Sequence, residues 1–176
     1  MENRLTFRPL KETEIDVRVQ SVTEKGCILL LYKDARCDMN ILDETVGPMN
    51  WKREHTRDNA NCIVSLWDEE KQQWVSKEDT GTESNTEKEK GQASDSFKRA
   101  CFNWGIGREL YTSPFIWVNA ADCNIREVKG KKACSDKFEV EKIAYDENKN
   151  ITGLSIKNTT KKKRVFLMKP PEEKRK

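Results

Sequence analysis

The stretch SDSFKRACFNWGIGRELY, residues 94–111, predicts a helix that ends abruptly. Apolar residues recur there at helical spacing and form a stripe that faces a core: Ala93, Phe97, Cys101 and Trp104. Gly105 is the residue type that ends a helix in the left-handed conformation. Lys98 and Arg99 lie off the stripe, so the helix carries two adjacent cations away from its buried face.

The sequence upstream of this helix alternates as strands do. Residues 49–79 contain three such segments separated by the turn signals DNAN and DEEKQ, which predicts an antiparallel meander. Before it, residues 34–46 read as a helix with Asp34 as N-cap, stopped by Gly47 and Pro48. Residues 15–32 alternate, turn at TEKG and continue as an apolar run, which predicts a β-hairpin.

The pattern of the sequence changes after Val118. Residues 119–137 read as a linker, and three short strands follow at 138–145, 151–158 and 164–169. We therefore predict an α+β fold. Its core is an antiparallel β-meander packed against a long helix, a β-β-β-α arrangement in residues 1–118. Residues 119–176 form a small C-terminal β appendage with a basic tail.

Composition and charge narrow the class of protein. The net charge is +3, and residues 161–176 hold an excess of six positive charges, which leaves −3 for the rest of the 176-residue chain. A nucleic-acid site in the body must therefore be a local patch. No apolar run has the length of a membrane span, and the first residues lack the apolar core of a signal peptide. We expect a cytoplasmic protein with no membrane partner.

The six cysteines and the single histidine indicate no metal or disulfide framework. No two cysteines form a C-x-x-C pair, and His55 is the only histidine. A zinc site is not expected from such spacing, and a disulfide framework is not expected without an export signal. The expectation is free thiols, some of them buried, and no cofactor.

The basic pair of the helix has two interpretations. Adjacent Lys and Arg residues usually form a solvated face. Three features favour a ligand instead: Phe102 and Trp104 offer rings for stacking, the glycines at 105 and 107 permit close backbone approach, and Arg108 extends the basic edge. GIGRELY contains no phosphate-binding loop, which argues against an ATP-driven recombinase or helicase.

Residues 5–118 resemble the Rad-fifty-two type single-strand annealing proteins, especially the short phage and bacterial members, including the Sak type. The resemblance rests on three segments: EKGQASDSFKRACFNWGIGRELY, LLLYKDARCDMNILDETVGPMNWKREH and WVSKEDTG. It implies ATP-independent binding of single-stranded DNA, annealing of complementary strands in recombination and repair, and no enzymatic turnover. It also implies a homo-oligomeric ring or short filament.

The resemblance assigns the site residues by position. Lys98 and Arg99 match the family's basic pair, and Arg36 matches a basic residue of the opposite wall of the DNA groove. Lys88 and Lys90 match basic residues before the helix. Phe102 stands where eukaryotic members have an Arg, so we expect a stacked base there in place of a phosphate. A phage exonuclease or a host single-strand binding protein is a possible partner.

Two other functions stay open at this point. One is an adaptor that protects DNA ends and recruits partners through the tail, without annealing. The other is a metal-dependent nuclease that uses an acidic segment: Asp79, Glu83, Glu87 and Glu89. A solvated acidic loop is the more ordinary interpretation of that segment, because two-metal sites need carboxylates fixed on rigid elements.

Overall fold

The computed structural model describes residues 5–82 and 88–171, and for residues 88–90 it describes the helical backbone alone. The chain divides into two compact units. The first contains residues 5–8 and Asp34–Arg108, and the second contains Pro9–Lys33 and residues 109–171.

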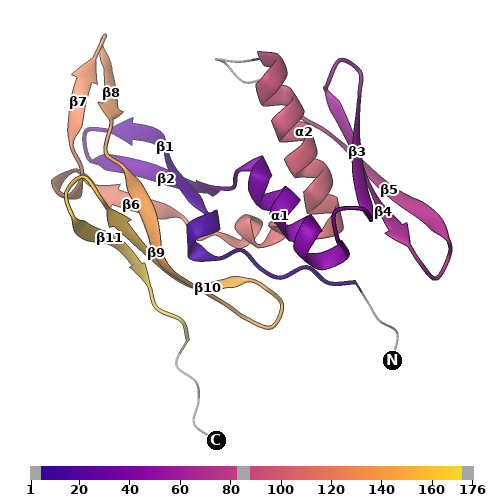
Figure 1. The fold of residues 1–176 in the computed structure, drawn as a ribbon. Coiled ribbons are helices and arrows are strands. Elements are labelled where there is room, and N and C mark those ends of the chain that lie inside the picture. The colour runs from indigo at the N-terminus through magenta and orange to yellow at the C-terminus, as the bar shows by residue number, and fades with distance from the viewer. Residues whose placement is uncertain (1–4, 83–87, 172–176) are drawn as a thin grey trace, which may run out of the picture. The chain divides into compact units, whose positions relative to one another are not determined.

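The first unit consists of a three-stranded antiparallel sheet and two helices (Figure 1). Its elements are α1 (Ala35–Val46), β3 (Trp51–Thr56), β4 (Asn61–Asp68), β5 (Gln73–Thr80) and α2 (Lys88–Trp104). The sheet order β3-β4-β5 is the meander that the sequence predicts. Helix α2 packs against β4 and β5, and α1 contacts both α2 and β3.

Local sequence explains the ends of both helices. Asp34 caps α1 by accepting a hydrogen bond from the amide of Arg36 at 2.7 Å, and Gly47 ends the helix with φ of 83°. Helix α2 ends at Trp104, and Gly105 follows with φ of 100°. The amide of Ile106 then donates back to the carbonyl of Cys101 at 3.1 Å, closing the C-terminal turn.

The core of this unit lies between the helices and the sheet. Of the predicted stripe on α2, Phe97 and Cys101 are fully buried, while Ala93 and Trp104 at its ends are half-buried. On α1 the most buried apolar residues are Ile41 and Leu42.

The second unit is built on a six-stranded sheet in the order β11-β10-β9-β1-β2-β6. Its strands are β1 (Asp16–Thr23), β2 (Gly26–Tyr32), β6 (Ile116–Asn119), β9 (Phe138–Tyr145), β10 (Ile151–Asn158) and β11 (Lys163–Met168). The edge strands β6 and β11 contact each other, so the sheet is nearly closed. The short helices are η1 (Glu12–Glu14), η2 (Arg108–Thr112) at the junction of the units, and η3 (Ala120–Asp122).

The segment that the sequence reads as a linker is structured, which corrects that expectation. It forms η3 and a separate hairpin of β7 (Ile125–Val128) and β8 (Lys131–Cys134). Lys129 and Gly130 form its two-residue turn with φ of 49° and 75°. Positive φ at both positions is the signature of a type I′ turn, and a Lys in the first position concealed it.

The fold class agrees with the sequence at the level of α+β. All described strand pairs are antiparallel, and the described residues contain two α-helices. The large sheet was not anticipated, because the pairing of β9 with β1 joins residues more than a hundred positions apart. The sequence sets its domain boundary after Val118, whereas β1, β2 and β6 share a sheet with β9–β11.

Candidate nucleic-acid interface

The two adjacent cations of α2 have different surroundings. Successive residues of an α-helix point about 100° apart, so Lys98 and Arg99 leave the helix in different directions. The Nε of Arg99 donates to Oδ2 of Asp95 at 2.9 Å, one turn earlier. Asp95 Oδ2 also accepts hydrogen bonds from the amide and hydroxyl of Thr82, at 2.9 and 3.1 Å. Arg99 therefore helps to tie the segment after β5 to the helix.

The ionisation of Asp95 fits this role. Burial raises the pKa of this carboxyl group, but the hydrogen bonds from Thr82 and the ion pair with Arg99 outweigh burial and hold the pKa below its usual range. The carboxylate is thus charged at neutral pH. Half of the predicted basic pair is engaged within the protein.

The charge of Lys98 acts on the N-cap of α1. The hydrogen bonds from Arg36 lower the pKa of Asp34, and the charge of Lys98 lowers it further. Arg36 binds the same carboxylate through Nε at 3.0 Å and Nη2 at 3.1 Å, while 82% of its side chain stays exposed. Cations from two different helices thus stabilise one carboxylate. Within the described residues Lys98 has no ion pair, and its side chain is half-buried.

A third cation of this unit was missed in the sequence. The guanidinium of Arg53, on β3, lies 4.7 Å from the ring centroid of Phe97 on α2. Trp51 stacks on the same ring, with centroids 6.2 Å apart. Arg53 is exposed, although Phe97 is fully buried. The sequence could have indicated this cation, because strand alternation places Arg53 on the same side of β3 as Trp51.

Two further lysines lie over tryptophan rings of this unit. Lys77 Nζ lies 4.7 Å from the ring of Trp104 and donates to the carbonyl of Asn103 at 2.8 Å. Lys52 Nζ lies 5.1 Å from the ring of Trp74, which is 39% exposed. Such cation–π contacts keep long side chains extended over the sheet. They also leave these charges at the surface of the sheet.

Phe102 lies in the last turn of α2, and Arg108 follows four residues after the helix ends. Arg108 donates through Nε and Nη2 to the carbonyl of Phe102, at 3.0 and 2.7 Å, and through Nη2 to that of Asn103 at 3.1 Å. It therefore caps carbonyls that a helix end leaves unpaired. The Phe102 side chain is half-buried. The side chains of Lys88 and Lys90 lie outside the described residues.

Of the acidic segment, Asp79 alone has a described side chain. Asp79 accepts hydrogen bonds from the Thr80 amide at 2.7 Å and from Asn103 at 3.2 Å. The side chains of Glu83, Glu87 and Glu89 lie outside the described residues. Burial lowers the pKa of His55, and the charge of Arg53 lowers it further.

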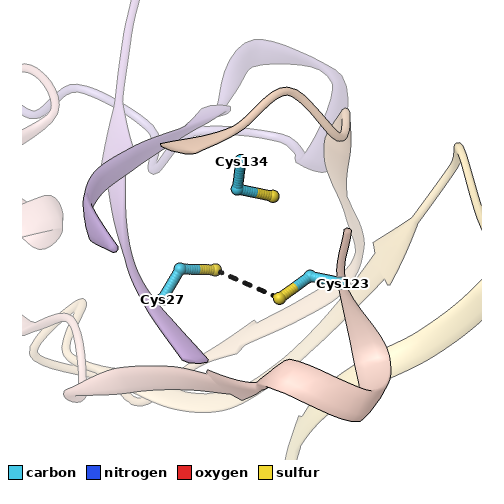
Figure 2. A group of neighbouring side chains, drawn as sticks. All are labelled: Cys27, Cys123 and Cys134. Carbon is cyan, nitrogen blue, oxygen red and sulfur yellow. Dashed lines mark hydrogen bonds between the residues drawn. The ribbon is translucent and has the colours of Figure 1, made fainter. Parts of the chain in front are cut away.

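The second unit contains a cluster of three cysteines that the sequence did not indicate (Figure 2). Cys27, Cys123 and Cys134 have their sulfurs within 4.8 Å of one another. The thiol of Cys27 donates to the sulfur of Cys123 at 3.9 Å. Burial raises the pKa of Cys27 far above its usual range, and Cys123 adds to this. Cysteine spacing does not reveal this cluster, because its members are distant in sequence.

Comparisons of the chain with protein-family models, with curated proteins and with solved structures find no match. Among the described residues, no helix has the length and apolar character needed to span a membrane.

Proposed function

We propose that this chain binds single-stranded DNA through the α1–α2 side of its first unit and anneals complementary strands without nucleotide hydrolysis. It acts without enzymatic turnover, in the recombination and repair of phage or prophage DNA in the bacterial cytoplasm. The meander β3–β5 with α2 is then the β-β-β-α core of a Rad-fifty-two type annealing protein. An exonuclease or a single-strand binding protein is a fitting partner.

One observation carries this proposal: Arg36 on α1 binds the carboxylate of Asp34, and the charge of Lys98 on α2 acts on the same carboxylate. Arg53, on β3 of the same unit, adds an exposed cation. Arg36 and Lys98 together leave one positive charge in excess of Asp34. Phosphates are bound by such patches without reading of sequence.

Annealing needs phosphates held while bases stay free to pair. Cations fixed on helices and strands hold the backbone in one register, because the secondary structure is rigid. Accessible rings support stacked bases without choosing among them. Three rings of this unit offer such a surface: Trp74, which is 39% exposed, and the half-buried Phe102 and Trp104.

The sheet edges support a homo-oligomer. Among the described strands, β3 and β5 each pair with β4 alone. An edge strand presents unpaired backbone donors and acceptors, and proteins normally cover such edges. Neighbouring subunits of a ring or short filament are the cover that we propose.

The test is an annealing assay with two complementary oligonucleotides, one labelled at each end of the future duplex. We expect the wild type to accelerate annealing without ATP or magnesium. The double variant Lys98→Ala/Arg36→Ala is expected to lose most of this acceleration. Lys71→Ala is the control for the loss of one charge, because Lys71 lies in the β4–β5 turn and pairs with Asp68 at 2.6 Å.

Three outcomes would contradict the proposal. Binding without acceleration would indicate an adaptor that protects DNA ends. Magnesium-dependent cleavage would indicate a nuclease. The double variant removes two charges and Lys71→Ala removes one, so a loss in the double variant no more than twice that in the control would show that the assay reports net charge instead of a defined surface.

A further inference from the structure

Three segments of the second unit bring a cysteine to one point. Cys27 lies near the start of β2, Cys123 directly follows η3, and Cys134 is the last residue of β8. Figure 2 shows the three side chains pointing toward one another. Cys27 and Cys123 are almost completely buried, and Cys134 is half-buried.

The backbone around each cysteine is fixed by hydrogen bonding. Cys27 pairs with Val22 on one side and Val118 on the other, in the interior of the six-stranded sheet. Cys134 pairs with Ile125 in the β7–β8 hairpin. The cysteines are therefore held on rigid elements, as ligands of a preformed site are.

A buried carboxylate joins the two segments that carry Cys123 and Cys134. Asp136 accepts hydrogen bonds from the amide and the side chain of Asn124, both at 2.9 Å, and from Asn158 at 2.7 Å. Asn124 follows Cys123 directly, and Asp136 lies two residues after Cys134. This network keeps the two thiols in place from outside the cluster, in the way that outer hydrogen bonds orient metal ligands.

The sulfur spacing matches a thiolate-bound metal. A zinc–sulfur bond of about 2.3 Å in tetrahedral geometry places two sulfurs about 3.8 Å apart. Cys27 and Cys123 have their sulfurs 3.9 Å apart, and all three sulfurs lie within 4.8 Å. A shift of about 1 Å or less in the third side chain completes the geometry.

We propose that Cys27, Cys123 and Cys134 bind one thiophilic metal ion, with zinc as the expected ion and water as its fourth ligand. A disulfide joins two sulfurs at about 2.05 Å and does not account for the position of the third cysteine. Soft thiolate ligands select zinc and copper(I) among the common ions. The bound ion links β2, η3 and β8, and this role is independent of DNA binding.

An open pocket of about 480 Å³ gives the ion a route to the cluster. Its lining residues are Glu24, Ala120, Cys123, Asn124, Ile125 and Lys132. Three thiolates and one Zn²⁺ carry a net charge of −1. Lys132 is the nearby cation of the pocket, and it also pairs with Glu127 at 3.2 Å and Glu24 at 3.7 Å.

The experiment uses the full chain, reduced and then dialysed against Zn²⁺ or Co²⁺ alone. We expect one zinc per chain by atomic emission, and sulfur-to-cobalt charge-transfer bands of the intensity of three thiolates. Cys134→Ser should lower zinc affinity by about 10–100-fold or more, since loss of an outer hydrogen bond already costs that much. Cys37→Ser, in α1 of the first unit, should change neither measurement.

Two results would overturn the proposal. The first is folded protein that takes up no stoichiometric zinc after reduction, whether its thiols stay free or Cys27 and Cys123 are recovered as a disulfide. The second is Cys134→Ser with the metal affinity and charge-transfer bands of the wild type. Cys134→His is the second variant, in case Cys134→Ser fails to fold. It should retain one zinc, with charge-transfer bands reduced to those of two thiolates. Unchanged bands would contradict the proposal.

Discussion

Replacing Lys98 and Arg99 one at a time should separate a phosphate contact from a structural ion pair. Single-strand binding depends on salt with a slope of about −0.7 for each phosphate that the protein neutralises. The charge of Lys98 acts on Asp34, the carboxylate that Arg36 binds. Lys98→Ala should therefore reduce the slope of log K against log salt by about 0.7 and weaken binding to all sequences alike.

Arg99→Ala should behave differently because its partner is Asp95. A helical ion pair four residues apart contributes about 0.3–0.5 kcal/mol when it is exposed, and 39% of the Arg99 side chain is exposed. We expect the melting temperature to fall by about 1–2 °C. The salt slope should change by clearly less than in Lys98→Ala, because Asp95 already neutralises the Arg99 charge.

The assay is fluorescence anisotropy with a labelled homopolymer strand, titrated at four or more salt concentrations, alongside thermal melting of each variant. Lys71→Ala serves as the control for net charge. Equal slope reductions in the two variants would refute the reasoning, since they would mean that Arg99 leaves Asp95 for a phosphate. Unchanged slopes in both variants would show that neither Lys98 nor Arg99 on α2 binds a phosphate.

The remaining predictions concern stacking, acid stability and assembly. If Phe102 stacks a base, Phe102→Ala should weaken binding by about 1–3 kcal/mol with the salt slope intact; an early-melting variant that binds normally when folded would return Phe102 to the core. Hydrogen bonds from Arg164 and Ser155 lower the pKa of Glu141 to about 2. The stability that this carboxylate contributes is present above pH 4.5, its unperturbed value, and is lost as pH falls toward 2. Acid unfolding should therefore be shallower in Glu141→Gln than in the wild type over that range, and identical curves would contradict the pairing. Light scattering should show assemblies larger than a tetramer, and monomers throughout the micromolar range would exclude the ring.

The first unit was predictable because its signals are local. The Asp34 cap, the Gly47 and Gly105 stops and the strand alternation of residues 49–79 each depend on neighbours within a few positions. The contacts of these elements then follow from the apolar stripe on α2. The sequence therefore predicted both the meander and the helix that packs on it.

The second unit was harder to predict because its pairings are distant. Its strands at 138–145 and 151–158 were found, since they alternate, but nothing local shows that Phe138 pairs with Val17. The same reason hid the cysteine cluster, in which Cys27 and Cys123 are separated by 96 positions. Metal-site spacing rules apply where ligands share a hairpin or a turn, and here only Cys123 and Cys134 lie in one local segment.

The opening feature of the sequence, two adjacent cations on one helix, has a physical explanation in the different directions of their side chains. A cation that is to hold a phosphate must be positioned, and the element that carries it must not move. Arg99 contributes to the second condition, since Asp95 joins it to Thr82 after β5. Lys98 is then free of that task, one residue earlier and about 100° around the helix. Adjacent positions thus combine a structural ion pair and a phosphate contact on one helical turn. Comparing the salt slopes of Lys98→Ala and Arg99→Ala tests whether the two residues divide these roles.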